Sequence, residues 1–337
     1  MSEAEGNPPR PAAHSPEEAP IGAGGFRVAM MYHPSHHVTD LDAAERWFAR
    51  VFGRSSTNLS ATLRGAPTPP GRRMDYSLFT PINDVLFDTI DPKLYLVDGI
   101  QRYPTVDRPH LKGFGWYIEG ADGVTGLYQA LKGRGYRIIG QNDEPAEGEE
   151  PPGVGGMPLF FTVPEDTGLR YEFLPRISFP LDPRVRPDWV LPPVSDDDPL
   201  GIERCSHHTV LTDRPERQLR LFVDVLGGEV FREERDETVG ATGTYVHLAD
   251  AVYEFAVPDE GTPAHDDWAG NAPQDTYHAI TFKVADLGRV ARHLEAEGVG
   301  VRTRTDHAIV TDPDTSLGVP WGFTDAPVPG DPRGDHR

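Results

Sequence analysis

The sequence has a single cysteine, few basic residues and no long apolar run, and each shortage excludes a class of protein. Cys205 can form no intramolecular disulfide, which fits a reducing, cytoplasmic location. A cysteine-based zinc site is excluded as well, so a metal site would need histidine, aspartate or glutamate. No apolar run approaches the ~18 residues of a membrane span, and no secretory signal is visible.

Basic residues are outnumbered by acidic ones, 32 to 53, which gives a formal net charge of −21. A chain this acidic repels phosphate backbones and anionic lipid headgroups. The segment 64–73, with three arginines, is a local exception. We therefore expect a small-molecule partner rather than nucleic acid or a membrane, and we leave open whether the chain forms a homodimer.

The 337 residues are enough for about two domains. Residues 1–25 have almost no bulky apolar side chain and predict a disordered tail. Residues 176–200 are rich in proline and aspartate and predict an extended linker. Residues 327–337 are interpreted as a second tail, which leaves two domains at 26–175 and 201–326.

One pattern recurs four times in these domains. A strand precedes an amphipathic helix that ends near glycine, and short strands complete the unit. The opening and closing strands of the four copies are predicted at 27–33 and 94–97, 113–118 and 169–173, 205–213 and 252–257, and 278–284 and 319–323.

The first and third copies align when the glycines that end their helices, Gly53 and Gly227, are superposed. His33 then falls on His207, and the segment 94–97 falls on the closing strand of the third copy. Two further strand-like segments of the first copy, near 75–80 and 85–90, lie between its helix and that closing strand.

Two motifs accompany the repeat. Histidines stand in three opening strands, at Tyr32-His33, Ser206-His207-His208 and Tyr277-His278. An aromatic-Glu-Phe sequence closes two copies, at Tyr171-Glu172-Phe173 and Tyr253-Glu254-Phe255. With its four ordered copies, the chain resembles the vicinal oxygen chelate superfamily, which includes glyoxalases, bleomycin resistance proteins and extradiol dioxygenases. The resemblance implies an α+β fold of four βαβββ units that form two paired barrels.

The resemblance also implies a metal site in the C-terminal domain. Its ligands would be His207, Glu254 and His278, with His208 as the alternative to His207. The fourth family position is occupied by Gly322, which cannot bind a metal and would leave room for water or substrate. Fe(II) is the first expectation for the ion, with Mn, Zn or Ni as alternatives.

The strand pattern supports part of this assignment. Side chains alternate between faces, so Glu254 should lie on the opposite face from Tyr253 and Phe255. An unpaired buried carboxylate costs several kcal/mol, which favours a cation beside Glu254. His278 lies one residue earlier than the repeat requires; a bulge could restore it, and otherwise Ala279 occupies the ligand position.

The N-terminal domain offers a poorer set of ligands. His33 and Glu172 stand at two of its family positions, with Leu96 and Gly113 at the others, so we interpret this half as a partner that has lost its metal. A salt bridge to Arg170 is the alternative role for Glu172. The candidates for proton transfer are Glu172, His33, His37 and Tyr253.

The resemblance leaves three functions open. A metal with free positions suits substrates with two adjacent oxygens, and the first specific hypothesis is a ring-cleaving dioxygenase. The glutamate stands on the third copy rather than the fourth, which departs from the ring-cleaving pattern and keeps a glyoxalase- or epimerase-type isomerase or lyase open. A non-catalytic protein that binds a small molecule, such as an antibiotic, is the third.

Overall fold

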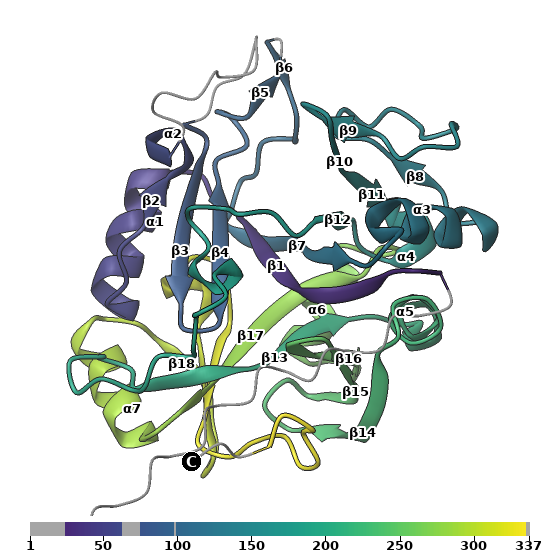
Figure 1. Ribbon diagram of the computed structural model, residues 1–337. Coiled ribbons are helices and arrows are strands. Elements are labelled where there is room, and N and C mark those ends of the chain that lie inside the picture. The colour runs from purple at the N-terminus through teal and green to yellow at the C-terminus, as the bar shows by residue number, and fades with distance from the viewer. Residues whose placement is uncertain (1–23, 63–74, 98, 335–337) are drawn as a thin grey trace, which may run out of the picture.

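The computed structural model describes residues 24–62, 75–97 and 99–334. The predicted tail at 1–25 and the arginine-containing segment 64–73 therefore lie almost entirely outside the described residues. Within these ranges the fold is α+β and contains two eight-stranded mixed sheets, one from each half of the chain (Figure 1). The expected fold class is confirmed.

The N-terminal sheet has the strand order β2-β3-β4-β1-β7-β12-β11-β8. Its central strands β1 and β7 are antiparallel, and β4 and β12 flank them in parallel. The first two βαβββ units thus pair with each other. The strands are β1 (Arg27–His37), β2 (Thr57–Asn58), β3 (Ser77–Ile82), β4 (Val85–Ile90), β7 (His110–Glu119), β8 (Ile138–Ile139), β11 (Phe160–Thr162) and β12 (Tyr171–Pro175).

The C-terminal sheet repeats this arrangement in the order β14-β15-β16-β13-β17-β20-β19-β18. The third unit pairs with the fourth through β13 and β17. The strands are β13 (Ile202–Leu211), β14 (Glu229–Asp236), β15 (Ala241–Leu248), β16 (Ala251–Pro258), β17 (Thr276–Val284), β18 (Val301–Arg304), β19 (Ala308–Thr311) and β20 (Trp321–Thr324).

One predicted strand has a different place. Residues 94–97 do not close the first unit, because β5 (Leu96–Val97) pairs only with β6 (Ile100–Gln101) in a small separate sheet. The strand beside β1 is β4, which follows β3 through a tight turn at Asn83, whose φ is 51°. A second small sheet joins β9 (Gly153–Val154) and β10 (Met157–Pro158).

Each unit contributes a helix after its first strand. Asp40 caps α1 by accepting a hydrogen bond from the Ala43 amide at 3.0 Å, and Asp286 caps α7 in the same way, as is typical of aspartate at this position. The helical segments are α1 (Leu41–Trp47) with the π-helical turn Phe48–Phe52, α2 (Leu59–Thr62), α3 (Gly123–Gly133), α4 (Pro164–Thr167), α5 (Pro215–Phe222), α6 (Pro263–Ala269), α7 (Leu287–Ala296) and the 3₁₀ turns Pro183–Val185 and Pro313–Thr315. No helix among the described residues is both long and apolar enough to span a membrane.

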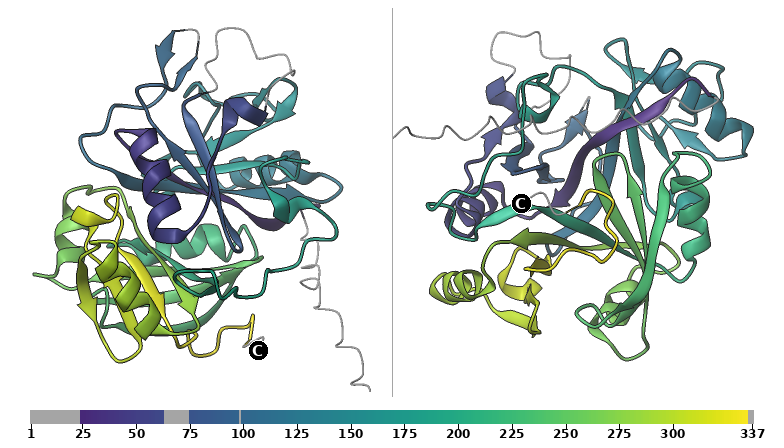
Figure 2. Two further views of the ribbon diagram at one scale, coloured as in Figure 1. Left: turned by 90° about the vertical axis from the view of Figure 1, so that its left-hand side faces the viewer. Right: turned by 60° about the horizontal axis from the view of Figure 1, so that its bottom comes forward.

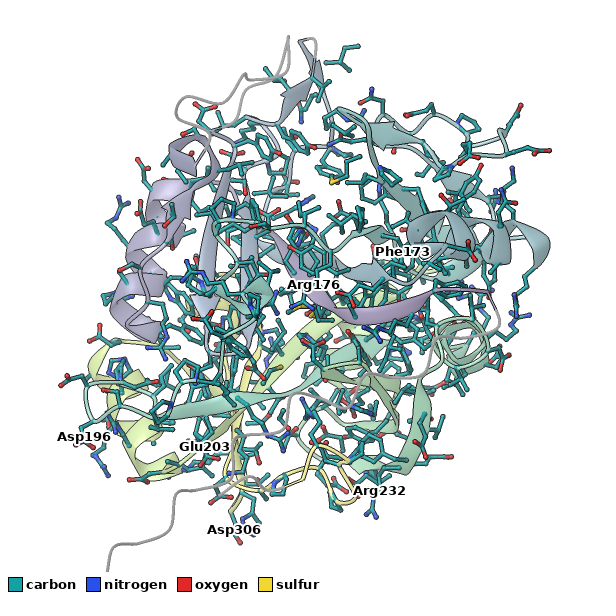
Figure 3. The ribbon with its side chains drawn as sticks, in the orientation of Figure 1. Phe173, Arg176, Asp196, Glu203, Arg232 and Asp306 are labelled. Atoms are coloured by element: carbon teal, nitrogen blue, oxygen red, sulfur yellow. The ribbon has the colours of Figure 1, made fainter. Side chains whose placement is uncertain are left out.

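One hydrophobic core lies between the two sheets and beneath α1, α3, α5 and α7. Figure 2 shows the halves stacked against each other, and Figure 3 shows Phe173 in the interior while Asp196 and Asp306 lie at the periphery. We call the face of each sheet that packs into this core its core face, and the opposite face its outer face. Tyr253 and Phe255 lie on the core face, so Glu254 belongs to the outer face, as the strand pattern predicts.

Candidate metal centre

The C-terminal sheet brings His207 and Glu254 together on its outer face. Their strands β13 and β16 are parallel neighbours, with Thr209 in register with Glu254. The Nε2 atom of His207 lies 3.8 Å from Oε2 of Glu254. Both side chains are buried, so two of the three predicted ligands meet away from bulk water.

Asp236, at the end of β14, joins these two residues. One ligand atom from each of His207, Asp236 and Glu254 lies within 4.8 Å of the other two. The backbone N–H and the hydroxyl of Thr238 both donate to Oδ1 of Asp236, at 2.7 and 2.6 Å. The turn that follows β14 therefore holds the carboxylate in place, although no motif in the sequence marks this residue.

Neighbouring side chains position the carboxylate of Glu254. Thr209 donates a hydrogen bond to Oε2 at 2.7 Å, and the Tyr245 hydroxyl donates to Oε1 at 3.0 Å. A Cβ atom at Gly243 would lie only 2.3 Å from Oε1, so glycine leaves the space that the carboxylate occupies. Burial, reinforced by the negative charge of Asp236, raises the pKa of Glu254 to about 8, which indicates that a nearby cation would stabilise its charged form.

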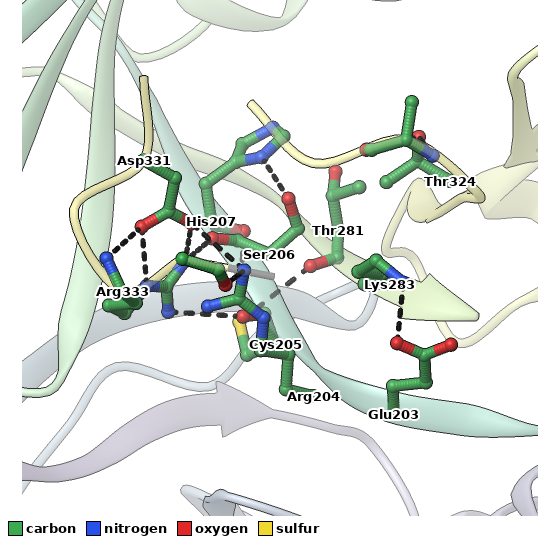
Figure 4. A network of polar contacts seen from close by, with 12 residues as sticks. Glu203, Arg204, Cys205, Ser206, His207, Thr281, Lys283, Thr324, Asp331 and Arg333 are labelled. Carbon is green, nitrogen blue, oxygen red and sulfur yellow. Dashed lines mark hydrogen bonds and ion pairs between the residues drawn. The ribbon is translucent and has the colours of Figure 1, made fainter. Parts of the chain in front are cut away.

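A contact at Nδ1 orients the imidazole ring of His207. The Ser206 hydroxyl lies 3.1 Å from Nδ1 (Figure 4), which leaves Nε2 facing Glu254. Arg333, from the C-terminal segment, donates hydrogen bonds to the carbonyl oxygens of Cys205, at 3.2 Å, and Ser206 (Figure 4). Burial lowers the pKa of His207, so the ring is neutral at pH 7 and can act as a metal ligand.

The donor set fits a divalent cation. Ligand bonds of about 2.0–2.2 Å place the donor atoms of one ion roughly 3–4.4 Å apart, close to the separations in the His207–Asp236–Glu254 group. One neutral imidazole and two carboxylates also balance the charge of such an ion. An imidazole with oxygen donors suits first-row ions such as Mn(II), Fe(II) or Zn(II).

A cavity of about 180 Å³ lies on the same outer face. Its lining includes Thr281, the register partner of His207, and Gly322, the register partner of Thr281. Arg302 also lines the cavity. None of the three potential ligands lines the cavity itself, but Thr238, which donates to Asp236, does, so the cavity neighbours the His207–Asp236–Glu254 group.

His278 lines this cavity but does not join the three potential ligands. Between the pairs Thr209–Ala279 and Val210–Tyr277 the register shifts, and His278 is the extra residue at this bulge. Its Nδ1 atom lies 2.7 Å from Oδ2 of Asp267, on α6. The strand therefore has a bulge at His278, and Ala279 is the residue in register with Thr209.

The other predicted site residues lie elsewhere. His208 and Tyr253 are on the core face: His208 Nδ1 lies 2.7 Å from the Tyr277 hydroxyl, and Tyr253 accepts a hydrogen bond from Trp116. His37 is buried on β1, with its ring 4.9 Å from that of Tyr103. The remaining two, His33 and Glu172, meet on the outer face of the N-terminal sheet.

The family model of the Glyoxalase/Bleomycin resistance protein/Dioxygenase superfamily matches residues 204–316. The match covers the strands that carry His207, Asp236 and Glu254, and it confirms the resemblance inferred from the sequence motifs. A search of curated proteins finds no match.

Solved structures share the fold over most of the chain. The Mn(II)-bound glyoxalase from Novosphingobium aromaticivorans is 14% identical with a TM-score of 0.53, and the match covers 89% of this chain and 82% of that chain. The 2,3-dioxygenase LapB from Pseudomonas sp. KL28 is 12% identical with a TM-score of 0.54, covering 92% and 96%. A variant of 4-hydroxymandelate synthase from Streptomyces coelicolor is 13% identical with a TM-score of 0.54, covering 88% and 92%. At such identities the likeness shows the fold alone.

Proposed function

We propose that this chain, with the fold of the glyoxalase, bleomycin resistance and dioxygenase superfamily, is a metal-dependent enzyme that acts on a small oxygenated molecule at the outer face of its C-terminal sheet. The observation that carries the proposal is the buried His207–Asp236–Glu254 group beside a cavity. A divalent cation bound there supplies Lewis-acid stabilisation of negative charge on substrate oxygens.

The cavity and its lining indicate the size and charge of the substrate. Its volume of about 180 Å³ is below the ~300–1,000 Å³ usual for drug-sized ligands, which favours a small molecule. Arg302 and Glu237 both line the cavity, so its wall carries one charge of each sign. A substrate with an anionic group would therefore orient with that group toward Arg302.

His278 gives the cavity a group that can move a proton. Its Nδ1–H donates to Asp267, which leaves Nε2 as the basic nitrogen, since one nitrogen of a neutral imidazole is always an acceptor. This arrangement favours isomerase or lyase chemistry, in which Nε2 removes a proton from a substrate carbon next to a carbonyl group and returns it at another position. Ring cleavage has less support, because a single imidazole accompanies the two carboxylates.

Metal content tests the site directly. Protein purified anaerobically and loaded with Mn(II) should lose at least one equivalent of metal in His207→Ala and in Glu254→Gln. His307→Ala is the matched control, since this exposed histidine pairs only with Asp325, at 3.1 Å, among the described residues. Unchanged metal content in both site variants would refute the proposal.

A second measurement separates the reactions. Loaded protein is incubated in D₂O with a panel of α-hydroxy ketones and 2-oxo aldehydes and followed by proton NMR, while catechol is tested in an oxygen electrode. We expect carbon-bound deuterium that His278→Asn reduces at least 100-fold. Oxygen consumption with catechol would instead identify ring cleavage, and metal-free protein that binds an aromatic antibiotic would identify a binding protein.

A further inference from the structure

The opening strand of the third unit, β13, carries a bulge directly before His207. Cys205 and His207 are in register with consecutive residues of β17, so Ser206 is the extra residue. Residues two apart normally share a face of a strand, yet Cys205 packs into the core and the ring of His207 lies on the outer face. The bulge interrupts the alternation at this point and therefore sets the direction of His207.

Two charged side chains hold the backbone of this bulge. Asp84 lies in the turn between β3 and β4, in the other half of the chain, and its Oδ1 atom accepts a hydrogen bond from the Cys205 amide at 2.7 Å. From the C-terminal segment, Arg333 donates to the carbonyl oxygens of Cys205, at 3.2 Å, and Ser206 (Figure 4). Asp331 fixes the guanidinium of Arg333 by accepting from its Nε and Nη2 atoms, at 3.0 and 2.8 Å. The bulge is thus tied at one amide and two carbonyl groups.

The N-terminal half repeats the arginine contact at its own bulge. An Asp-Pro-Arg sequence follows the last strand of each half at the same spacing, at 182–184 after β12 and at 331–333 after β20. The aspartate of the first motif binds the guanidinium of Arg184 through two hydrogen bonds of 2.8 Å. Arg184 donates in turn to the carbonyl oxygen of Tyr32, the residue before His33, in the bulge of β1. The same three-residue motif therefore serves the same strand position in both halves.

The aspartate contact recurs as well, with the two halves exchanged. Asp250 lies in the turn between β15 and β16 and accepts a hydrogen bond from the Met31 amide of β1 at 2.7 Å, just as Asp84 does from the Cys205 amide. Each half therefore supplies a carboxylate that holds the bulge of the other half. Because two independent contacts recur at both bulges, we interpret them as a feature that fixes the bulge rather than as incidental packing.

We propose that Arg333 and Asp84 are positioning residues of the C-terminal metal site: they hold the bulge that directs Nε2 of His207 toward Glu254. The inference rests on the proposed function, in which His207 is a ligand of the ion. Both residues act through the backbone of β13, since their contacts are with its amide and carbonyl groups. Groups that orient a metal ligand typically change the affinity for the metal about 10–100-fold when they are removed. Through Asp84, the N-terminal half takes part in a site to which it contributes no proposed ligand.

Manganese affinity, measured on the full chain, tests the positioning role. Protein is stripped with EDTA and titrated with Mn(II), and electron paramagnetic resonance follows the free ion. We expect Arg333→Ala and Asp84→Ala to bind Mn(II) about 10-fold more weakly than the wild type, because the bulge relaxes and Nε2 of His207 leaves its place. Lys283→Ala is the matched control: it removes a positive charge from β17 beside the bulge, but its amine pairs with the Glu203 carboxylate rather than with the bulge backbone. Losses no greater than in Lys283→Ala would overturn the proposal.

The nitrogen coupling of bound Mn(II) separates a positioning role from a loss of stability. Electron spin-echo envelope modulation reports an imidazole nitrogen bound to the ion. We expect this signal to weaken in Arg333→Ala at saturating Mn(II), while circular dichroism shows an intact fold. Asp84→Asn keeps an oxygen that can accept from the Cys205 amide, so it should bind Mn(II) more tightly than Asp84→Ala, and this pair decides the question if Arg333→Ala does not fold. Equal affinities in the two Asp84 variants would show that the hydrogen bond to Cys205 does not position the ligand.

His207→Ala, measured in the same titration, keeps the two proposals apart. If His207→Ala loses the ion while Arg333→Ala and Asp84→Ala retain the affinity and the nitrogen signal of the wild type, the positioning role alone is overturned. If His207→Ala binds Mn(II) as tightly as the wild type, the proposed function is overturned, and the positioning role with it.

Discussion

At the scale of single residues, the C-terminal site depends on where one buried carboxylate can lie. Glu254 is completely buried and held by Thr209 and Tyr245. Its carboxylate occupies the space left by the missing side chain of Gly243. Gly243, which offers no donor atom, therefore controls where a proposed ligand can lie.

Gly243→Ala should weaken metal binding without removing a donor. The added methyl group would lie 2.3 Å from Oε1 of Glu254, so the carboxylate must move, and we expect the affinity for Mn(II) to fall at least 10-fold, about 1.4 kcal/mol. Titration followed by electron paramagnetic resonance measures the change. Gly133→Ala is the control, because its added Cβ would meet no atom within 4 Å.

His207 and Glu254 could be predicted from the sequence because strand alternation and the repeat both constrain them. Asp236 could not, because its direction depends on the turn with Thr238, which neither periodicity nor spacing specifies. The place of His278 depends on a bulge between β13 and β17. Such a one-residue shift leaves the strand pattern intact, so the sequence allowed either His278 or Ala279 to be in register with β13.

At the scale of elements, the four βαβββ units were predictable and one closing strand was not. The segments at 85–90 and 94–97 both have apolar, strand-like composition. The choice between them depends on how much chain each unit inserts before its last strand, which the glycine superposition cannot measure. The tight turn at Asn83, which joins β3 to β4, is the local signal that could have decided it.

The C-terminal segment is an element whose contribution can be measured. Arg333 reaches the backbone of Cys205 and Ser206, beside His207, and pairs with Asp331 at 2.8 Å. Arg333→Ala removes these hydrogen bonds and leaves Asp331 with Arg204 alone, among the described residues, as its ion-pair partner, at 3.3 Å, so we expect a loss of about 1–3 kcal/mol in the free energy of unfolding.

Denaturant unfolding gives this free energy, and hydrogen exchange should show faster exchange at residues 325–334 and in the first part of β13. Arg292→Ala is the control, since its ion pair with Asp286 spans 3.8 Å and is exposed. Equal losses in the two variants would mean that the segment contributes no more than an ordinary surface ion pair.

At the scale of the whole molecule, buried side chains of the two halves share one apolar core. The Trp116 indole donates to the Tyr253 hydroxyl at 2.8 Å, and side chains of both sheets form one apolar cluster. The sequence could not show which units pair, because the same order of strand, helix and short strands recurs in all four copies. It also could not show that both halves present an acid–imidazole group on their outer faces.

His36 joins the two halves and should make their association sensitive to acid. It is buried on β1, with Nε2 2.9 Å from the carbonyl oxygen of Leu317 in the C-terminal half. Burial, together with the positive charge of protonated His110, lowers the pKa of His36 from 6.5 to about 4 despite that hydrogen bond. Between pH 6.5 and about 4, the folded protein therefore binds fewer protons than the unfolded chain.

The direction in which pH changes the stability follows from this difference in proton binding. The stability that His36 contributes is present above pH 6.5 and is lost as the pH falls toward 4, by about 2 kcal/mol between pH 7 and 4.5. His36→Gln keeps an N–H donor for Leu317 but does not titrate. Denaturant unfolding at pH 7 and 4.5 measures the free energy of unfolding. On acidification, we expect His36→Gln to lose about 2 kcal/mol less of this free energy than the wild type. Equal losses would show that the imidazole of His36 stays neutral, or is charged without cost, at the junction of the two sheets.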